Sequence, residues 1–180
     1  MRLIKYTLIF LFALLLSTSL CAKTAIEIDT QANAAFQKFD KEVKGSVAFV
    51  DNNVKALLIF PSIIKAGIGI GGEYGEGVLR VDGKSVQYYS TASASIGFQL
   101  GVQKKSLIIA FMTEKSLNDF RNKNGWKVGV DGSIALINVG IGKDINTETA
   151  NKPVVGFMFG NKGLMYNLTI EGSKFTKIVR

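Results

Sequence analysis

Glycine constrains this chain more than any other residue. Of its 19 glycines only Gly45 precedes residue 67, and six fall within the run Phe60–Gly77. Glycine disfavours helix interiors, so the chain beyond this point is predicted to be mainly sheet, while the segment before it is free to be helical. Alternate glycines also remove the side chains from one face of a strand, which predicts sharp curvature or close approach of another element. These glycines are Gly67, Gly69 and Gly71.

The segment before the glycines has a helical pattern. Between residues 26 and 54, apolar side chains recur at the spacing of a helix with one buried side. Thr30 is a candidate cap at its start, and Gly45 predicts a break between a longer and a shorter helix. A further helix is predicted at Glu114–Asn122.

The later segments carry strand signals. Between Ala92 and Val102, apolar residues alternate with serine, glycine and glutamine, which predicts a long strand whose apolar side is buried and whose polar side faces outward. Asp82-Gly83 predicts a hairpin turn. The fold class that follows is α+β: N-terminal helices packed on a curved, mostly antiparallel, glycine-rich β-sheet or barrel, in a single domain.

The first 22 residues have the character of a secretory signal. Arg2 and Lys5 precede an uncharged apolar run, Tyr6–Leu16, which is short for a bilayer span of about 20 residues. A retained anchor is the alternative. We expect residues 1–22 to be a signal peptide, with cleavage after Ala22 or one residue earlier, and residues 23–180 to form the binding domain.

Cys21 offers a second route for the same segment. A cysteine at the end of an apolar run can be acylated and become the first residue of a lipoprotein. The preceding residues, Leu20 and Thr18, differ from the small residues of that signal. The protein is therefore expected to be exported, either free in the periplasm or secreted, or else anchored to the membrane by acylation of Cys21.

The composition excludes several chemistries. The chain has no histidine and one cysteine, so disulfides, His or Cys metal sites and a Ser-His-Asp triad are not expected. We expect no cofactor and no metal. Glu73 and Glu76 are the one carboxylate pair worth weighing as acid and base, but their spacing on a strand points them to different faces. We expect no enzyme activity.

Two near-motifs for phosphate binding fail on context. Gly67, Gly69 and Gly72 fit G-x-G-x-x-G, but further glycines and two glutamates follow instead of a helix. Gly83-Lys84-Ser85 resembles the end of a P-loop, yet the glycine that such a loop needs is replaced by Val78. Nucleotide binding is not expected.

The charge favours an anionic partner. Removing Arg2 and Lys5 from the 22 basic residues leaves 20 against 14 acidic ones, a mature charge of +6. An exported basic protein meets anionic lipid or wall phosphate rather than nucleic acid; the alternative is that this charge only favours solubility. Trp126 is predicted either to lie in the core or to be an interfacial anchor.

Three segments carry a family resemblance. Lys55–Leu79, Ala94–Thr113 and Gly163–Phe175 resemble the SYLF lipid-binding family, here an exported member of bacterial type, and the resemblance extends from about Ala32 onward. The block GGEYGEG is its most specific part. We interpret the motif residues in this block as structural. They are Gly71, Gly72, Glu73, Tyr74, Gly75 and Gly77.

The resemblance implies a membrane contact on an amphipathic N-terminal segment with basic residues. Lys38, Lys41 and Lys44 step along the predicted helix beside its apolar stripe. The chain departs from the family pattern at Gly129–Ser133 and at Pro153–Phe159, so contacts from that edge are not carried over. The lipid-binding residues implied are Phe36, Lys38, Phe39, Lys41, Lys44, Lys55 and Lys65.

The function expected from these observations is non-enzymatic binding in the cell envelope. The protein would associate with anionic phospholipid, such as phosphatidylglycerol or cardiolipin, through its basic amphipathic N-terminal region. The alternative is a structural or protein-interaction module that uses the Ser/Gly/Gln face of Ser93–Gln103. The sequence does not identify a protein partner.

Overall fold

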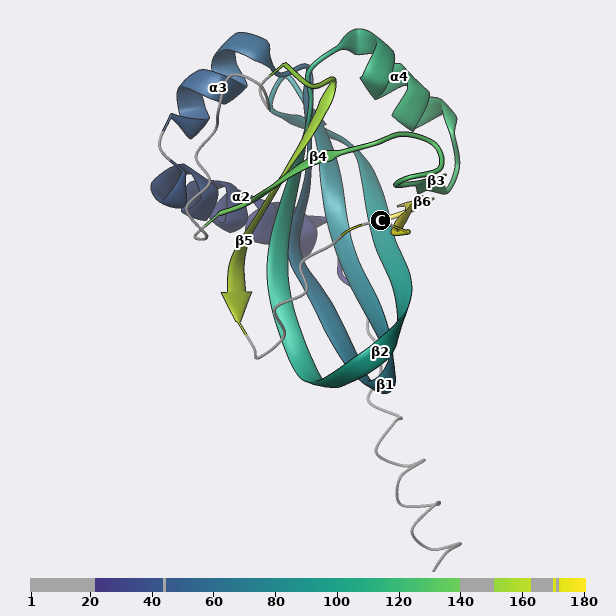
Figure 1. Ribbon diagram of the computed structural model, residues 1–180. Helices are drawn as coiled ribbons and strands as arrows, with labels where there is room; N and C mark the ends of the chain where they lie inside the picture. The colour runs from purple at the N-terminus through teal and green to yellow at the C-terminus, as the bar shows by residue number, and fades with distance from the viewer. Residues whose placement is uncertain (1–21, 44, 140–150, 163–169, 171) are drawn as a thin grey trace, which may run out of the picture.

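The computed structural model describes residues 22–43, 45–139, 151–162, 170 and 172–180, and in this part of the chain the fold is α+β, as predicted (Figure 1). Along the chain, the helices and strands are α2 (Ala25–Glu42), α3 (Ser46–Asn53), β1 (Ala56–Val81), β2 (Lys84–Phe111), α4 (Glu114–Asn122), β3 (Trp126–Lys127), β4 (Ala135–Asn138), β5 (Val154–Lys162) and β6 (Lys174–Ile178). None of the helices described combines the length and apolar character that crossing a bilayer requires.

Helix α2 begins earlier than the sequence predicts. Its cap is Thr24, not Thr30: the Thr24 hydroxyl accepts a hydrogen bond from the Glu27 amide, and the Glu27 carboxylate accepts one from the Thr24 amide at 2.7 Å. This reciprocal pair is a capping box, which satisfies two free donors at once. The predicted break at Gly45 is confirmed, because Gly45 has φ +78° and α3 starts at the next residue.

Strands β1 and β2 form one very long hairpin. Their register runs from Ala56 opposite Phe111 to Val81 opposite Lys84. Asp82 and Gly83 have φ values of +49° and +73°, as expected for a two-residue turn with left-handed central residues. The predicted hairpin turn is therefore confirmed.

The hairpin is folded back on itself at the glycine run. Both strands curve over at the lower end in Figure 1. A Cβ atom on Gly67 would lie 2.4 Å from Gly71 Cα, and one on Gly77 would lie 2.4 Å from the Ile59 carbonyl oxygen. The two halves of β1 therefore approach too closely for any side chain at these positions, and the close approach predicted for the alternate glycines is found.

The shorter strands extend the hairpin into a curled sheet. β5 pairs with the second half of β2, β6 pairs with the first half, and β3 pairs with β6, all antiparallel; β4 pairs with β5 in parallel. The order is β3-β6-β2-β5-β4, with β1 on β2. The sheet forms a half-barrel that is mostly antiparallel, as predicted.

Each face of the sheet has its own core. We call the face that carries Phe60 and Leu107 inner, and the face that carries Ile59 and Ile108 outer. The inner core also contains α4 and the aromatic rings of β3 and β6. The outer core is formed against α2 and α3. The ring centroid of Phe39, on α2, lies 4.9 Å from that of Phe157.

Trp126 belongs to the inner core. Its ring centroid lies 5.7 Å from that of Phe120 and 6.1 Å from that of Phe175, and its side chain is buried. The prediction that Trp126 lies in the core is thus confirmed, and the prediction that it is an interfacial anchor is wrong.

Candidate functional site

The lower outer face of the hairpin, beyond α2, is apolar and exposed. Ile70 is 71% exposed and Val102 is 65% exposed, and Ile64 and Tyr74 are about half exposed. Residues directly opposite in an antiparallel ladder share a face, so Ala66 joins Val102, Gly72 joins Ala94, and Tyr74 joins Ala92. We call this surface the apolar face; its described residues are Ile64, Ala66, Ile70, Gly72, Tyr74, Ala92, Ala94 and Val102.

The burial of Ala92, Ala94 and Val102 is the reverse of what the sequence predicts. The apolar residues Ala92, Ala94 and Val102 face outward, whereas Gln103 is 1% exposed. Gln103, on the polar side, points into the folded hairpin and is therefore not a protein-contact residue. The side chains of residues 95–100 lie outside the described part.

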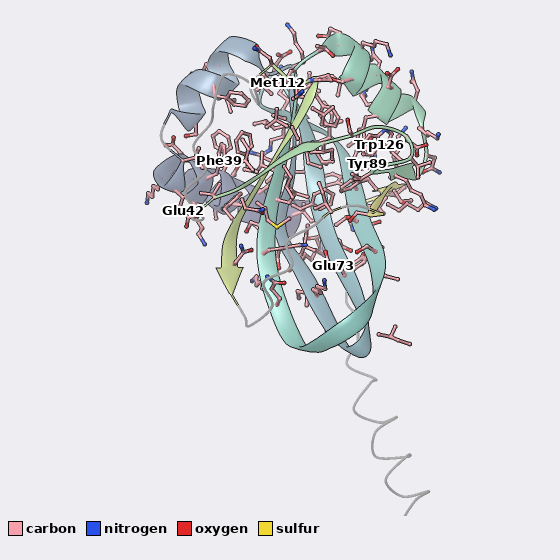
Figure 2. All side chains as sticks on the ribbon, viewed as in Figure 1. Phe39, Glu42, Glu73, Tyr89, Met112 and Trp126 are labelled. Atoms are coloured by element: carbon pink, nitrogen blue, oxygen red, sulfur yellow. The ribbon has the colours of Figure 1, made fainter. Side chains whose placement is uncertain are left out.

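The interior of the lower hairpin is charged. Glu73 lies between two lysines: its Oε2 atom is 2.8 Å from Lys105 Nζ, and its Oε1 atom is 3.5 Å from Lys65 Nζ. Figure 2 places Glu73 within the lower half of the curled sheet. Lys65 is buried with the carboxylate, so it does not offer the lipid contact predicted for it.

A basic groove runs beside the apolar face, between α2 and the hairpin. Its volume is about 550 Å³, and its charged side chains are Lys23, Lys38 and Lys104. Lys38 lies 3.5 Å from Glu42 and Lys23 Nζ donates to Gln31 at 2.8 Å. We call this surface the basic groove. Its remaining lining residues are Gln31, Ala34, Ala35, Pro61, Ser62, Ile64, Ser106 and Gly160.

The groove and the apolar face are continuous. Ile64 belongs to both, and Lys104 is its direct partner across the β1–β2 ladder. Lys104 and Val102 follow each other on the outer side of β2, two residues apart. Cationic and apolar side chains thus form one amphipathic surface.

The other predicted lipid-binding residues are scattered. Phe39 is fully buried against Phe157 and Phe159, so it does not offer the contact predicted for it. Lys41 is exposed on α2. Lys44 and the predicted acylation site Cys21 lie outside the described residues.

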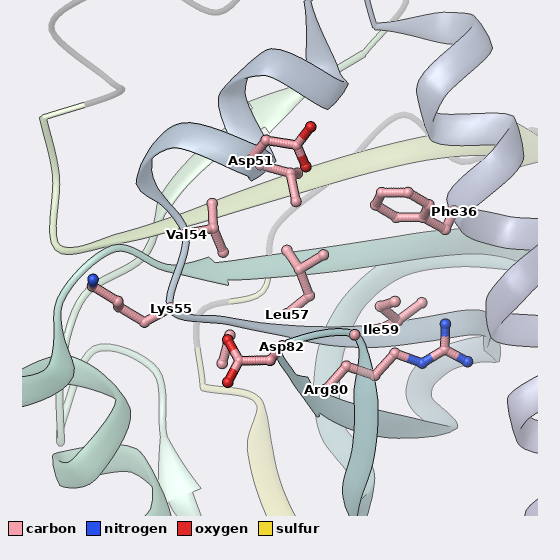
Figure 3. Close-up of a pocket in the computed structure, with 11 residues that line it drawn as sticks. Phe36, Asp51, Val54, Lys55, Leu57, Ile59, Arg80 and Asp82 are labelled. Atoms are coloured by element: carbon pink, nitrogen blue, oxygen red, sulfur yellow. The ribbon is translucent and has the colours of Figure 1, made fainter.

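Phe36 and Lys55 line a separate cavity of about 350 Å³ below α3 (Figure 3). Its wall is apolar at Leu57 and Ile59, while Asp51, Asp82 and Arg80 carry its other charges. The two carboxylates would repel an anionic headgroup. Arg80 is already engaged with α2, donating to Asn33 at 2.7 Å.

A third cavity, of about 260 Å³, lies where the chain enters the fold. It is lined by Ala22, Lys23, Ile64, Tyr74, Glu76 and Arg180, among others. Glu76 accepts hydrogen bonds from the Tyr74 hydroxyl at 2.8 Å, from Arg180 at 2.6 Å and from the Lys23 amide at 3.2 Å. Burial alone would raise the pKa of Glu76, but these donors outweigh burial and hold the pKa below its usual value.

Glu73 and Glu76 do not form an acid–base pair. Glu73 points into the hairpin and Glu76 points to the outer side, as their spacing predicts, and each carboxylate is already held by cations. Within the described residues, no three histidine, cysteine or acidic side chains are placed to hold a metal ion.

The GGEYGEG block, residues 71–77, lies where the hairpin folds back. Gly75 and Gly77 lie against Ile63 and Ile59, where an added Cβ atom would clash. Glu73 is in the charged interior, and Tyr74 is on the apolar face. The motif thus contributes to close packing and also to the exposed surface.

The fold and these surfaces define a glycine-rich α+β domain with an amphipathic outer side. Residues 92–178 match the model of the Ysc84 family, described as Las17-binding protein actin regulator. The match agrees with the SYLF resemblance that the sequence indicated over these residues. A comparison with curated proteins finds no match.

Sequence reasoning missed the residues that make this surface. The sequence pattern points to neither Lys23 nor Lys104, and it places Val102 on the buried side of a strand. The available signal was the alternation of Lys65, Glu73, Gln103 and Lys105 with apolar residues in both strands. A period of two shows which side chains share a face but not which face is buried.

Proposed function

We propose that this protein is a non-enzymatic binding protein that docks on anionic lipid surfaces through the basic groove and the apolar face. The observation that carries the proposal is the pairing of Ile64 with Lys104, which joins the two surfaces. Amphipathic surfaces of this kind bind lipid by burying apolar area at the headgroup boundary while cations attract anionic headgroups.

The two surfaces supply complementary energies. A lysine near an anionic membrane contributes about 1 kcal/mol, and this part weakens with salt. An apolar side chain moved fully out of water contributes about 1.5–3 kcal/mol, largely independent of salt. Ile70 and Val102 are the most exposed members of the apolar face, so they are expected to contribute most to the salt-resistant part.

We extend the proposal to the cell envelope. Its support is the signal-like sequence of residues 1–22 and the position of Ala22, which lines the same cavity as Ile64 and Tyr74. A leader or an acylated Cys21 would thus join the body beside the apolar face. Either route brings this face toward a membrane.

Co-sedimentation with lipid vesicles tests the proposal. We expect binding to vesicles that contain phosphatidylglycerol, weaker binding at high salt, and little binding to phosphatidylcholine alone. Replacing Lys38 and Lys104 by glutamine should weaken the binding about tenfold, from two charges at about 1 kcal/mol each before partial compensation. The matched control replaces Lys84 and Lys177, which are exposed outside the groove. Equal loss in both variants would reject the groove as the site.

A protein partner is the second candidate. The family description names a binding protein that regulates actin, and an exposed apolar surface can also seat a protein. In this case vesicle binding would not depend on lipid composition, and the protein would co-purify with one stoichiometric partner. Serine substitutions at Ile70 and Val102 would then release that partner.

A further inference from the structure

The backbone nitrogen of Lys23 points at a buried carboxylate. It lies 3.2 Å from Glu76 Oε2, and the Glu76 residue is 5% exposed. The other oxygen, Oε1, accepts from Tyr74 and Arg180. In these contacts, Oε2 is the Glu76 atom that faces the backbone of Lys23.

We propose that Glu76 is the receptor for a processed amino terminus at Lys23. Hydrolysis of the Ala22–Lys23 peptide bond by an endopeptidase adds one water: the carbonyl carbon of Ala22 becomes a carboxylate, and the nitrogen of Lys23 becomes an α-ammonium. The neutral amide donor facing Glu76 is thereby replaced by a cation in the same place. The hydrogen bond becomes an ion pair.

The surroundings favour this exchange. Ala22 is exposed and Lys23 is half-buried, so a peptidase can reach the peptide bond between them. After cleavage, the Lys23 nitrogen would stay beside Glu76. Thr24 caps α2 immediately afterwards, which fixes Lys23 on a rigid helix start. Removing the residues before Lys23 requires no movement of the described core.

A carboxylate between two cations is already used elsewhere in this protein. Glu73 holds both Lys65 and Lys105. After processing, Glu76 would hold Arg180 and the α-ammonium in the same way. The other titratable groups nearby are the Tyr74 hydroxyl, which donates to Glu76, and the Glu27 carboxylate, which accepts from the Thr24 amide and whose pKa is also lowered by the Lys23 charge.

The inference does not depend on lipid binding, and it separates two routes of maturation. Cleavage before Cys21 leaves an amide at Lys23 and creates no ion pair. Cleavage after Ala22 creates one. The receptor site therefore favours the second route, in which the protein is released instead of acylated.

Two forms of the protein test the proposal. One begins at Lys23, and the other carries Gly-Ser-Ala ahead of Lys23; both are made by removing a fusion partner. An NMR titration measures the pKa of the α-amino group in the first form. An ordinary α-amino group has a pKa of about 7.7–8.0, and the Glu76 carboxylate should raise it by about one unit.

Thermal unfolding of both forms gives the second readout. Because the folded pKa is raised, the form that begins at Lys23 should be the more stable one at neutral pH. This advantage should disappear as the pH rises through the raised α-amino pKa. Glu76→Gln should abolish the difference between the two forms even though it weakens each of them.

The outcomes are distinct. An α-amino pKa at its ordinary value in the form that begins at Lys23 would overturn the proposal. So would a raised pKa that persists in Glu76→Gln. If Glu76→Gln does not fold, the wild-type pKa and the pH dependence of the stability difference decide alone. None of these readouts uses lipid, so failure of the proposed function would leave them unchanged.

Discussion

Lys105 Nζ lies 2.8 Å from Glu73 Oε2 on the inner face of the hairpin, with both side chains almost completely withdrawn from solvent. Lys65 approaches the other oxygen of the same carboxylate. Buried charges are costly unless they are paired. One glutamate therefore makes it tolerable to bury two lysines, and it links the two halves of the folded hairpin, since Glu73 and Lys65 come from opposite sides of the bend.

Glu73→Gln should destabilise the fold strongly. The change leaves two buried ammonium groups without their carboxylate, and breaking a buried pair costs about 3–5 kcal/mol. Denaturant unfolding measures the loss. Glu42→Gln is the matched control, because Glu42 pairs with Lys38 on an exposed helix surface, where a pair contributes about 0–1 kcal/mol. Similar losses in the two variants would show that the inner cluster is not critical.

Gly77→Ala should also destabilise the fold, for a steric reason. The new Cβ atom would lie 2.4 Å from the Ile59 carbonyl oxygen and 2.7 Å from the Phe60 ring. Overpacking of this kind costs about 1–3 kcal/mol or more. Gly72→Ala is the control, since its Cβ atom would meet nothing closer than 3.8 Å. Thermal unfolding should show a large loss at Gly77 and little change at Gly72.

Ile70→Ser combined with Val102→Ser should weaken vesicle binding about tenfold while leaving unfolding almost unchanged. Both side chains are exposed, so their removal costs little in the folded state, whereas the apolar area that they bring to a membrane is lost. Val86→Ser with Val130→Ser is the control, as these valines are exposed outside the apolar face. Unchanged binding in the first variant would exclude the apolar face.

Glu76 should give part of the acid sensitivity of the fold. Its pKa is lowered in the folded protein, so its contribution is fully present above the unfolded value of about 4.3 and is lost as the pH falls through the folded pKa. The stability difference between wild type and Glu76→Gln should therefore be constant between about pH 5.5 and pH 7 and shrink toward pH 3. Thermal unfolding across this range measures it; a constant difference would contradict the lowered pKa.

Local features of the fold could be predicted from the sequence. The break at Gly45, the turn at Asp82-Gly83 and the helix Glu114–Asn122 depend on the conformational preferences of a few adjacent residues, and the structure confirms all three. The start of α2 was wrong because two threonines can cap a helix here. Only Thr24 has Glu27 three residues later to complete a capping box.

The orientation of the hairpin could not be predicted in the same way. Ala92, Ala94 and Val102 were expected inside because apolar side chains usually are. The fold at the glycine run instead brings Lys65 and Glu73 together on the inner side, and their ion pair makes the polar side tolerable there. Lys23 and Lys104 line one groove only because α2 packs on the outer face of the hairpin, a long-range contact that no local pattern encodes.

The folded-back hairpin also has a consequence for the order of folding. The β1–β2 ladder can grow outward from the Asp82-Gly83 turn by contacts that begin close in sequence, without any later strand. A chain that emerges amino terminus first can therefore form its charged interior before β5 and β6 are available. These two strands then add to opposite halves of β2, and Arg180 reaches Glu76 last. The ion pair between Glu76 and Arg180, beside Lys23, can therefore form only after the last residue of the chain has been synthesised.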